Sequence, residues 1–151
     1  MYNLIWSRNE LTTQKLGTFG EYYAKMALTS YGMSIYSSEV DDHGIDFVAE
    51  IKNQFLKFQV KSVRCGTSYV FVRKEHFDIS DNSLYLLLLF LEDGKHPVIY
   101  VLPATLWSNK DSKVFVYHAY AKPEYGINLS EKNMKQLEKY TLENVIETLM
   151  S

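Results

Sequence analysis

The chain has 151 residues, of which 46% are hydrophobic and 15% aromatic, and its formal net charge at pH 7 is -2. This length and apolar content predict one globular domain, spanning residues 1–151, with a core of its own. The small negative charge excludes a protein that coats nucleic acid through its overall charge.

The apolar segments of the chain bear on where the protein works. No sustained apolar run follows the first residues, so we expect no signal peptide. The longest apolar run, residues 84–91, is far shorter than the ~20 residues that cross a bilayer. We therefore expect a cytoplasmic protein without a membrane partner.

The single cysteine, Cys65, has no second cysteine for a disulfide or a thiolate metal site, and we expect it to be half-buried at a strand end.

The first predicted element is a helix over residues 17–31, which Gly32 ends. Its expected buried face consists of apolar residues at helical spacing: Phe19, Tyr22, Tyr23, Met26 and Ala27. A short strand over residues 34–39 and a polar turn over residues 41–44 are expected to follow.

Two segments of alternating apolar and polar residues come next, over residues 45–52 and 55–62. Such alternation is typical of strands with one buried face. The short connection predicts a hairpin that closes on Asn53 and Gln54. With that turn, the expected cross-strand pairs are Asp46 with Lys61, Val48 with Gln59, and Glu50 with Lys57.

The second half of the chain predicts further strands and short helices. Strands are expected over residues 68–73, 84–91, 98–102 and 114–118, and helical turns over residues 74–77 and 103–107. Residues 84–91 are apolar on both faces, as in a central strand between two layers. Ser130 and Thr141 are expected to begin two C-terminal helices. This order predicts an α/β fold in which a central mixed β-sheet is flanked by helices.

The hairpin brings three polar residue types toward one place. Gln59 and Lys61 must share a face because they are two residues apart on one strand. Asp46, on the neighbouring strand, is expected to converge with them on the more polar face. The sequence therefore predicts an acid, an amide and an amine in one pocket.

These residues carry a resemblance to a known family. Gly44-Ile45-Asp46, followed by Gln59-Val60-Lys61 thirteen residues after Asp46, resembles the motif of the PD-(D/E)xK nuclease superfamily. The similarity is to its Gln-x-Lys branch, which includes Mrr-like and Holliday-junction-resolvase-like proteins. Gly20-Glu21 also matches the family's habit of supplying a carboxylate from the first helix. The resemblance covers residues 17–73 and implies a restriction-endonuclease-like fold and a DNA endonuclease.

The resemblance also implies a role for each of four residues. Asp46, Gln59 and Glu21 would hold Mg²⁺ or Mn²⁺ through oxygen atoms. Lys61 would hold the attacking water or stabilise charge in the transition state. Ile45 stands in place of the family's proline, and Gln59 in place of its commoner carboxylate. The alternative is therefore a catalytically inactive nuclease-fold module that binds nucleic acid or a protein partner.

The cations of the chain are concentrated around the same motif. Residues 51–74 contain six Lys or Arg residues and no Asp or Glu. Four of these are expected to bind phosphates of nucleic acid: Lys57, Arg64, Arg73 and Lys74. DNA is the expected partner and RNA the alternative. A homodimer is also possible as an expectation, because two active sites are needed to cut both strands of a DNA duplex in one event.

Ordinary structural interpretations compete with these functional ones. Asp46 with Lys61, and Glu50 with Lys57, would also form cross-strand ion pairs, and Glu21 would form a helix-surface pair with Lys25. The Tyr117-His118-Ala119-Tyr120 run has rings that would stack on bases or fill the core, and we favour the core.

Overall fold

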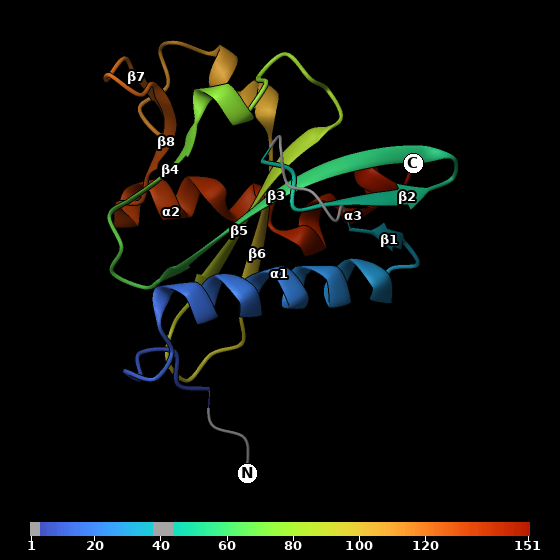
Figure 1. The fold of residues 1–151 in the computed structure, drawn as a ribbon, viewed down its shortest axis with the longest axis horizontal. Coiled ribbons are helices and arrows are strands. Elements are labelled where there is room, and N and C mark those ends of the chain that lie inside the picture. Colours follow the sequence, from blue (N-terminus) through green and yellow to red (C-terminus); the bar gives the residue numbers. More distant parts are fainter. Residues whose placement is uncertain (1–3, 38–43) are drawn as a thin grey trace.

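The computed structural model describes residues 4–37 and 44–151 of the chain. The elements in chain order are α1 (Thr13–Ser30), β1 (Ser34–Tyr36), β2 (Phe47–Ile51), β3 (Gln54–Arg64), β4 (Tyr69–Arg73), the 3-10 helix η1 (Lys74–His76), β5 (Leu84–Leu91), β6 (Val98–Pro103), the 3-10 helix η2 (Ala104–Ser108), β7 (Phe115–His118), β8 (Glu124–Asn128), α2 (Glu131–Leu137), the 3-10 helix η3 (Glu138–Tyr140) and α3 (Leu142–Met150) (Figure 1). Most of the predicted polar turn and the end of the first predicted strand lie outside the described residues.

A five-stranded mixed sheet with strand order β1-β2-β3-β5-β6 forms the centre of the fold. β5 runs parallel to β3, whereas the other neighbouring strands of this sheet are antiparallel. One face packs on α1 and α3, and the other packs on α2 and a second sheet of order β4-β8-β7 (Figure 1). The predicted mixed sheet flanked by helices is confirmed, while the second sheet was not foreseen.

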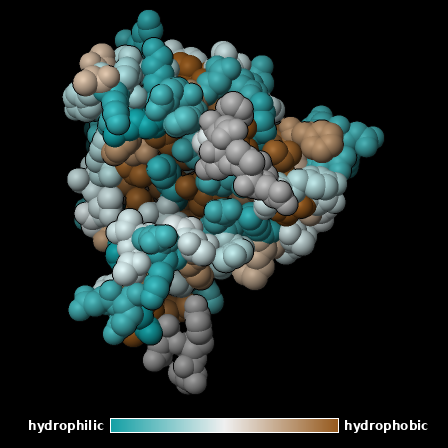
Figure 2. Space-filling model, in the orientation of Figure 1, coloured by the Kyte–Doolittle hydropathy of each residue, from teal (hydrophilic) through white to brown (hydrophobic). Residues whose placement is uncertain are grey.

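The central strand β5 is buried on both faces, as predicted. Leu86 and Leu88 belong to the core on the second-sheet side, and Leu87 and Leu89 to the core on the α1 side. On the surface of the molecule that Figure 2 shows, some hydrophobic residues are visible among hydrophilic ones. None of the helices in residues 4–37 and 44–151 has the length and apolarity to cross a membrane.

Helix α1 begins four residues earlier than predicted because Thr12 caps it. The Thr12 hydroxyl accepts a hydrogen bond of 3.2 Å from the Lys15 backbone N–H, as N-cap residues commonly do. The helix ends before Gly32, as predicted, and Gly32 takes a left-handed φ of +93°.

The buried face of α1 is only partly the predicted one. The predicted residues Phe19, Tyr23 and Ala27 are half-buried and pack against the cores, whereas Tyr22 and Met26 are 68% and 60% exposed.

The fully buried residues of α1 are Leu16, Gly20, Ala24 and Leu28. A Cβ added at Gly20 would lie 1.8 Å from Ser62 Oγ, so the helix lies too close to β3 for a larger side chain at this position. This close approach places the Gly20 side of the helix against the sheet.

The hairpin of β2 and β3 closes on Lys52 and Asn53, one residue earlier than predicted. Both residues have positive φ values, +49° and +65°, as a tight two-residue hairpin turn requires. The observed pairs are Phe47 with Phe58, Val48 with Lys57, Ala49 with Leu56, Glu50 with Phe55, and Ile51 with Gln54. The predicted pairs are therefore wrong by two residues. A shift of two leaves every side chain on its predicted face, which preserves the face shared by Gln59 and Lys61.

Cys65 is exposed rather than half-buried, because it lies in the turn directly after β3.

Candidate active site on β2 and β3

Asp46 lies at the point where the pairing of β2 with β3 ends. Its backbone N–H donates to the Phe58 carbonyl at 2.8 Å, and its Oδ2 accepts from the Val60 backbone N–H at 2.7 Å. The regular ladder of β2 and β3 ends at the pair of Phe47 with Phe58, and Asp46 bonds the two residues of β3 on either side of Gln59, which are Phe58 and Val60. The Asp46 carboxylate thus supplies a hydrogen-bond acceptor to β3 where the β2 ladder has stopped. Asp46 therefore lies next to the Gln59 segment of the backbone and not opposite Lys61, its predicted partner in the register.

Gln59 and Lys61 lie on the face of the sheet that packs toward the second sheet. Val63, which alternates in step with them on β3, belongs to that core, whereas Phe58 belongs to the α1 core. Gln59 Oε1 is buried and has no hydrogen-bond partner within the described residues. Buried polar atoms nearly always have a partner. This buried amide oxygen without a partner is the least usual feature of the site.

Lys61 is half-buried and pairs across the parallel ladder with Leu88 of β5. In residues 4–37 and 44–151 its ammonium has neither an ion pair nor a hydrogen bond. The predicted cross-strand ion pair of Lys61 with Asp46 is therefore not formed. An ammonium held in a partly dry setting is suited to bind an anion.

Glu21 lies on α1, and the structure does not bring it together with Gln59. Its Oε1 is 3.0 Å from Lys25 Nζ, which is the helix-surface pair of the structural interpretation. Lys25 Nζ is 5.8 Å from the centre of the Phe47 ring, so this pair lies near the start of β2. Across the described ranges there is no cluster of three or more His, Cys, Asp or Glu residues with metal-binding geometry.

Lys57 forms an ion pair with Asp81, which lies outside the hairpin of β2 and β3. Its Nζ lies 2.5 Å from Asp81 Oδ2, and this hydrogen bond lowers the pKa of Asp81 to about 2. The predicted pair of Lys57 with Glu50 is wrong. Glu50 instead accepts a 3.0 Å hydrogen bond from the Tyr36 hydroxyl. The positive charge of Lys57 is thus already compensated.

Arg64 and Arg73 also have partners within the fold. Arg64 Nε donates to the Trp6 carbonyl at 2.6 Å and another guanidinium nitrogen donates to the Leu11 carbonyl. Arg73 Nη1 lies 3.2 Å from Oε1 of the buried Glu124. Arg64 therefore fastens the N-terminal segment, and Arg73 neutralises a buried acid. Their binding to phosphates stays a prediction.

Lys74 differs from the other three predicted phosphate ligands. It is exposed, and its Nζ lies 5.3 Å from the centre of the Tyr117 ring. The aromatic run that contains Tyr117 does not fill the core, since Tyr117 and Tyr120 are 45% and 59% exposed. The core interpretation of this run is wrong.

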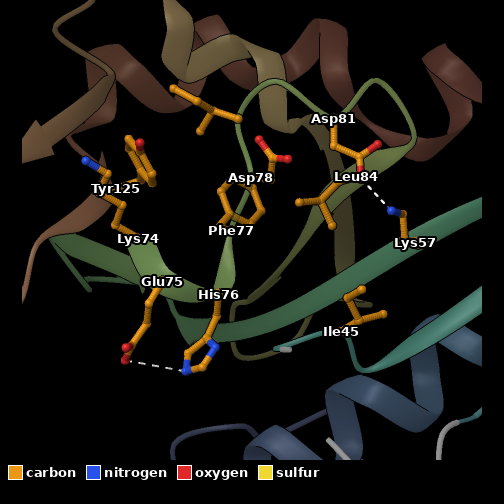
Figure 3. Close-up of a pocket in the computed structure, with 11 residues that line it drawn as sticks. Ile45, Lys57, Lys74, Glu75, His76, Phe77, Asp78, Asp81, Leu84 and Tyr125 are labelled. Carbon is orange, nitrogen blue, oxygen red and sulfur yellow. Dashed lines mark hydrogen bonds and ion pairs between the residues drawn. The ribbon is translucent and has the colours of Figure 1, made fainter. Parts of the chain in front are cut away.

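A hollow of about 550 Å³ borders the motif, and the sequence did not predict it (Figure 3). Ile45, next to Asp46, and Lys57, two residues before Gln59, form one side of it. Its charged lining mixes both signs: Lys57, Lys74, His76, Glu75, Asp78 and Asp81. Most of these belong to residues 74–81, an irregular segment that carries no recognisable motif.

Gly44 is needed where the motif approaches that segment. Its φ of +72° is left-handed, and an added Cβ would lie 2.6 Å from the Cβ of His76. The glycine of the Gly-Ile-Asp motif therefore lets the chain pass close to η1.

Comparisons with known proteins agree on the fold. No family model and no curated protein sequence matches the chain. A bacterial homing endonuclease, I-Ssp6803I, superposes with a TM-score of 0.57 at 15% identity, over 92% of this chain and 91% of that one. Hjc, a Holliday junction resolvase from the archaeal hyperthermophile Archaeoglobus fulgidus, superposes with a TM-score of 0.52 at 10% identity, over 89% of this chain and 97% of that one. The chain therefore has the restriction-endonuclease-like fold of PD-(D/E)xK nucleases, as the motif predicted.

Proposed function

We propose that the protein is a metal-dependent nuclease that hydrolyses phosphodiester bonds of DNA. The observation that carries this proposal is the buried Gln59 Oε1, unpartnered among the described residues, on a residue flanked by the two to which Asp46 is hydrogen-bonded, Phe58 and Val60. The likeness in fold to a homing endonuclease and a Holliday junction resolvase supports it.

The donor atoms at this place fit a hard divalent cation. Mg²⁺ and Mn²⁺ prefer carboxylate and amide oxygens, which Asp46 and Gln59 would supply. A cation would also satisfy the orphaned amide oxygen, whose burial otherwise costs free energy. Glu21 would join only after leaving Lys25 and moving from the face of the sheet that α1 covers. When bound, such an ion polarises the scissile phosphate and lowers the pKa of a coordinated water.

The remaining residues of the motif would position the substrate. The hydrogen bond from Val60 holds the Asp46 carboxylate in a fixed orientation. Lys61, which lacks an internal partner in the described chain, would donate to a phosphate oxygen or to the attacking water. Because Gln59 is neutral, the pair supplies one negative charge fewer than two carboxylates, so metal affinity should be modest.

Cleavage of plasmid and branched DNA, assayed with Mg²⁺ or Mn²⁺, tests this function. Wild type should cleave, while Asp46→Asn and Lys61→Ala should each lower the rate by two orders of magnitude or more. Glu50→Gln on β2 and Lys52→Ala in the turn are matched controls and should cleave like wild type. Equal cleavage by wild type, Asp46→Asn and Lys61→Ala would refute the proposal, as would no cleavage by any of them.

The neutral Gln59 also favours a second candidate, a nuclease-fold module that binds nucleic acid without cutting it. This module would bind DNA with an affinity that falls as salt rises, because phosphate contacts release counterions. Salt-dependent binding with no cleavage under any metal would establish this candidate in place of the first.

A further inference from the structure

A second hollow, of about 620 Å³, lies between η1, η2, β7 and β8. Its lining includes Lys74, Lys110 and His118 but no Asp or Glu among the described residues. The hollow is therefore suited to a ligand that carries negative charge.

Four aromatic side chains line this hollow: Tyr117, Tyr125, Phe115 and Trp107. Tyr117 is exposed, and its ring centre lies 5.4 Å from that of Tyr125. The Trp107 indole N–H donates to the Gly126 carbonyl at 2.9 Å, so its donor is already used. The surface offered to a ligand is thus the Tyr117 ring, with the Lys74 ammonium over it at 5.3 Å from the ring centre, where a stacked base would displace it.

The second hollow is a neighbour of the one at the candidate active site. Lys74, Ile79 and Tyr125 line both. In the first hollow, Lys74 and Tyr125 lie on the side away from Ile45 and Lys57 (Figure 3). The two hollows are therefore adjacent, with Ile45, next to Asp46, in the first and Tyr117 of β7 in the second.

We propose that this second hollow binds an unpaired nucleobase of the substrate strand. The inference rests on the proposed function and specifies its substrate, a nucleic acid with a single-stranded segment. Tyr117 stacks on the base, because an aromatic ring binds the face of any base without hydrogen bonds. Lys74 and Lys110 bind the phosphates on either side of that base. A base within a duplex is stacked on its neighbours and does not have a free face to offer.

Fluorescence anisotropy of the full chain, with a chelator present to prevent cleavage, tests the inference. The probes are a fluorescein-labelled single-stranded DNA and the same sequence as a duplex. Tyr117→Leu should weaken binding of the single strand by about tenfold, the order expected for loss of one base stack, and change duplex binding less than twofold. Tyr117→Phe, which keeps the ring, should bind like wild type and shows that the site folds without the hydroxyl.

Tyr22→Leu is the matched control, since Tyr22 is a more exposed tyrosine on α1. It should leave both affinities unchanged. Unchanged single-strand binding by Tyr117→Leu would overturn the inference, and so would an equal loss for strand and duplex. If Asp46-dependent cleavage persists in either case, the proposed nuclease stands without the base site. If the Tyr117 effect appears without any cleavage, the base site stands and the nuclease fails.

Discussion

The Asp46 carboxylate accepts a 2.7 Å hydrogen bond from the Val60 backbone N–H, and so joins the two strands of the motif. Asp46 should therefore stabilise the fold, and this role can be separated from its proposed role in cleavage. Asp46→Ala removes the acceptor and should lower the free energy of unfolding by about 1–3 kcal/mol, the cost of a partly buried N–H without a partner. Asp46→Asn keeps an acceptor oxygen and should be close to wild type in stability while losing cleavage. Urea unfolding of both variants checks this, and an Asp46→Ala protein as stable as wild type would contradict it.

Arg64 and Lys74 are expected to differ sharply although both were predicted to bind phosphate. Arg64 donates to the main chain of the N-terminal segment, so Arg64→Ala should cost about 2 kcal/mol in stability. Lys132→Ala on the exposed side of α2 is the control and should cost almost nothing.

The salt dependence of DNA binding separates the same two cations. Lys74→Ala should lower the slope of log affinity against log salt by about 1, while Arg64→Ala should lower it less, because two of the Arg64 donors are already bonded to the main chain. An unchanged slope for Lys74→Ala would show that this exposed lysine touches no phosphate.

Acid should weaken the contact between Lys57 and Asp81. The pKa of Asp81 is about 2 in the folded protein, below its ordinary value of 3.8, because Lys57 donates to the carboxylate. A depressed pKa stabilises the fold fully above pH 4, and this contribution is lost as the pH falls toward 2. Between pH 4 and pH 2, wild type should therefore lose more stability than Asp81→Asn, as followed by chemical denaturation. Parallel losses in the two proteins would contradict the assignment.

Gly20 and Ser62 are expected to be energetically coupled. Gly20→Ala should destabilise the protein because its Cβ would overlap Ser62 Oγ. Ser62 Oγ is buried without a partner among the described residues, so Ser62→Ala alone should be neutral or mildly stabilising. The double variant should recover part of the loss from Gly20→Ala, and strictly additive effects in thermal unfolding would argue against this close contact.

The sequence predicts the faces of the hairpin better than its register. Alternation with a period of two determines which side chains share a face, and a shift by two residues leaves the faces unchanged. The register depends on which two residues take positive φ, and here Lys52 and Asn53 do so without a glycine. The proximity of Asp46 to the strand that carries Gln59 was therefore predictable, and its hydrogen bonds to Phe58 and Val60 were not.

Other parts of the fold depend on contacts that are distant in the sequence. The acid-free stretch of residues 51–74 suggested a free cationic face, yet Asp81 and Glu124 reach Lys57 and Arg73 from other elements. Strand β8 was missed because it is short and three of its five residues, Glu124, Gly126 and Asn128, are of types depleted in strands. The side chain of Tyr69 packs against Gly126, the middle residue of β8.

Binding of Mn²⁺, measured by isothermal titration calorimetry without DNA, tests most directly whether Asp46 and Gln59 hold a cation. Wild type should bind one ion with modest affinity, and Asp46→Asn should weaken it at least tenfold. Gln59→Glu, which adds the missing charge, should bind more tightly than wild type. Glu50→Gln should bind like wild type. If the affinities of wild type, Asp46→Asn and Gln59→Glu are the same, the cation does not bind at this pair and the proposed metal site is wrong.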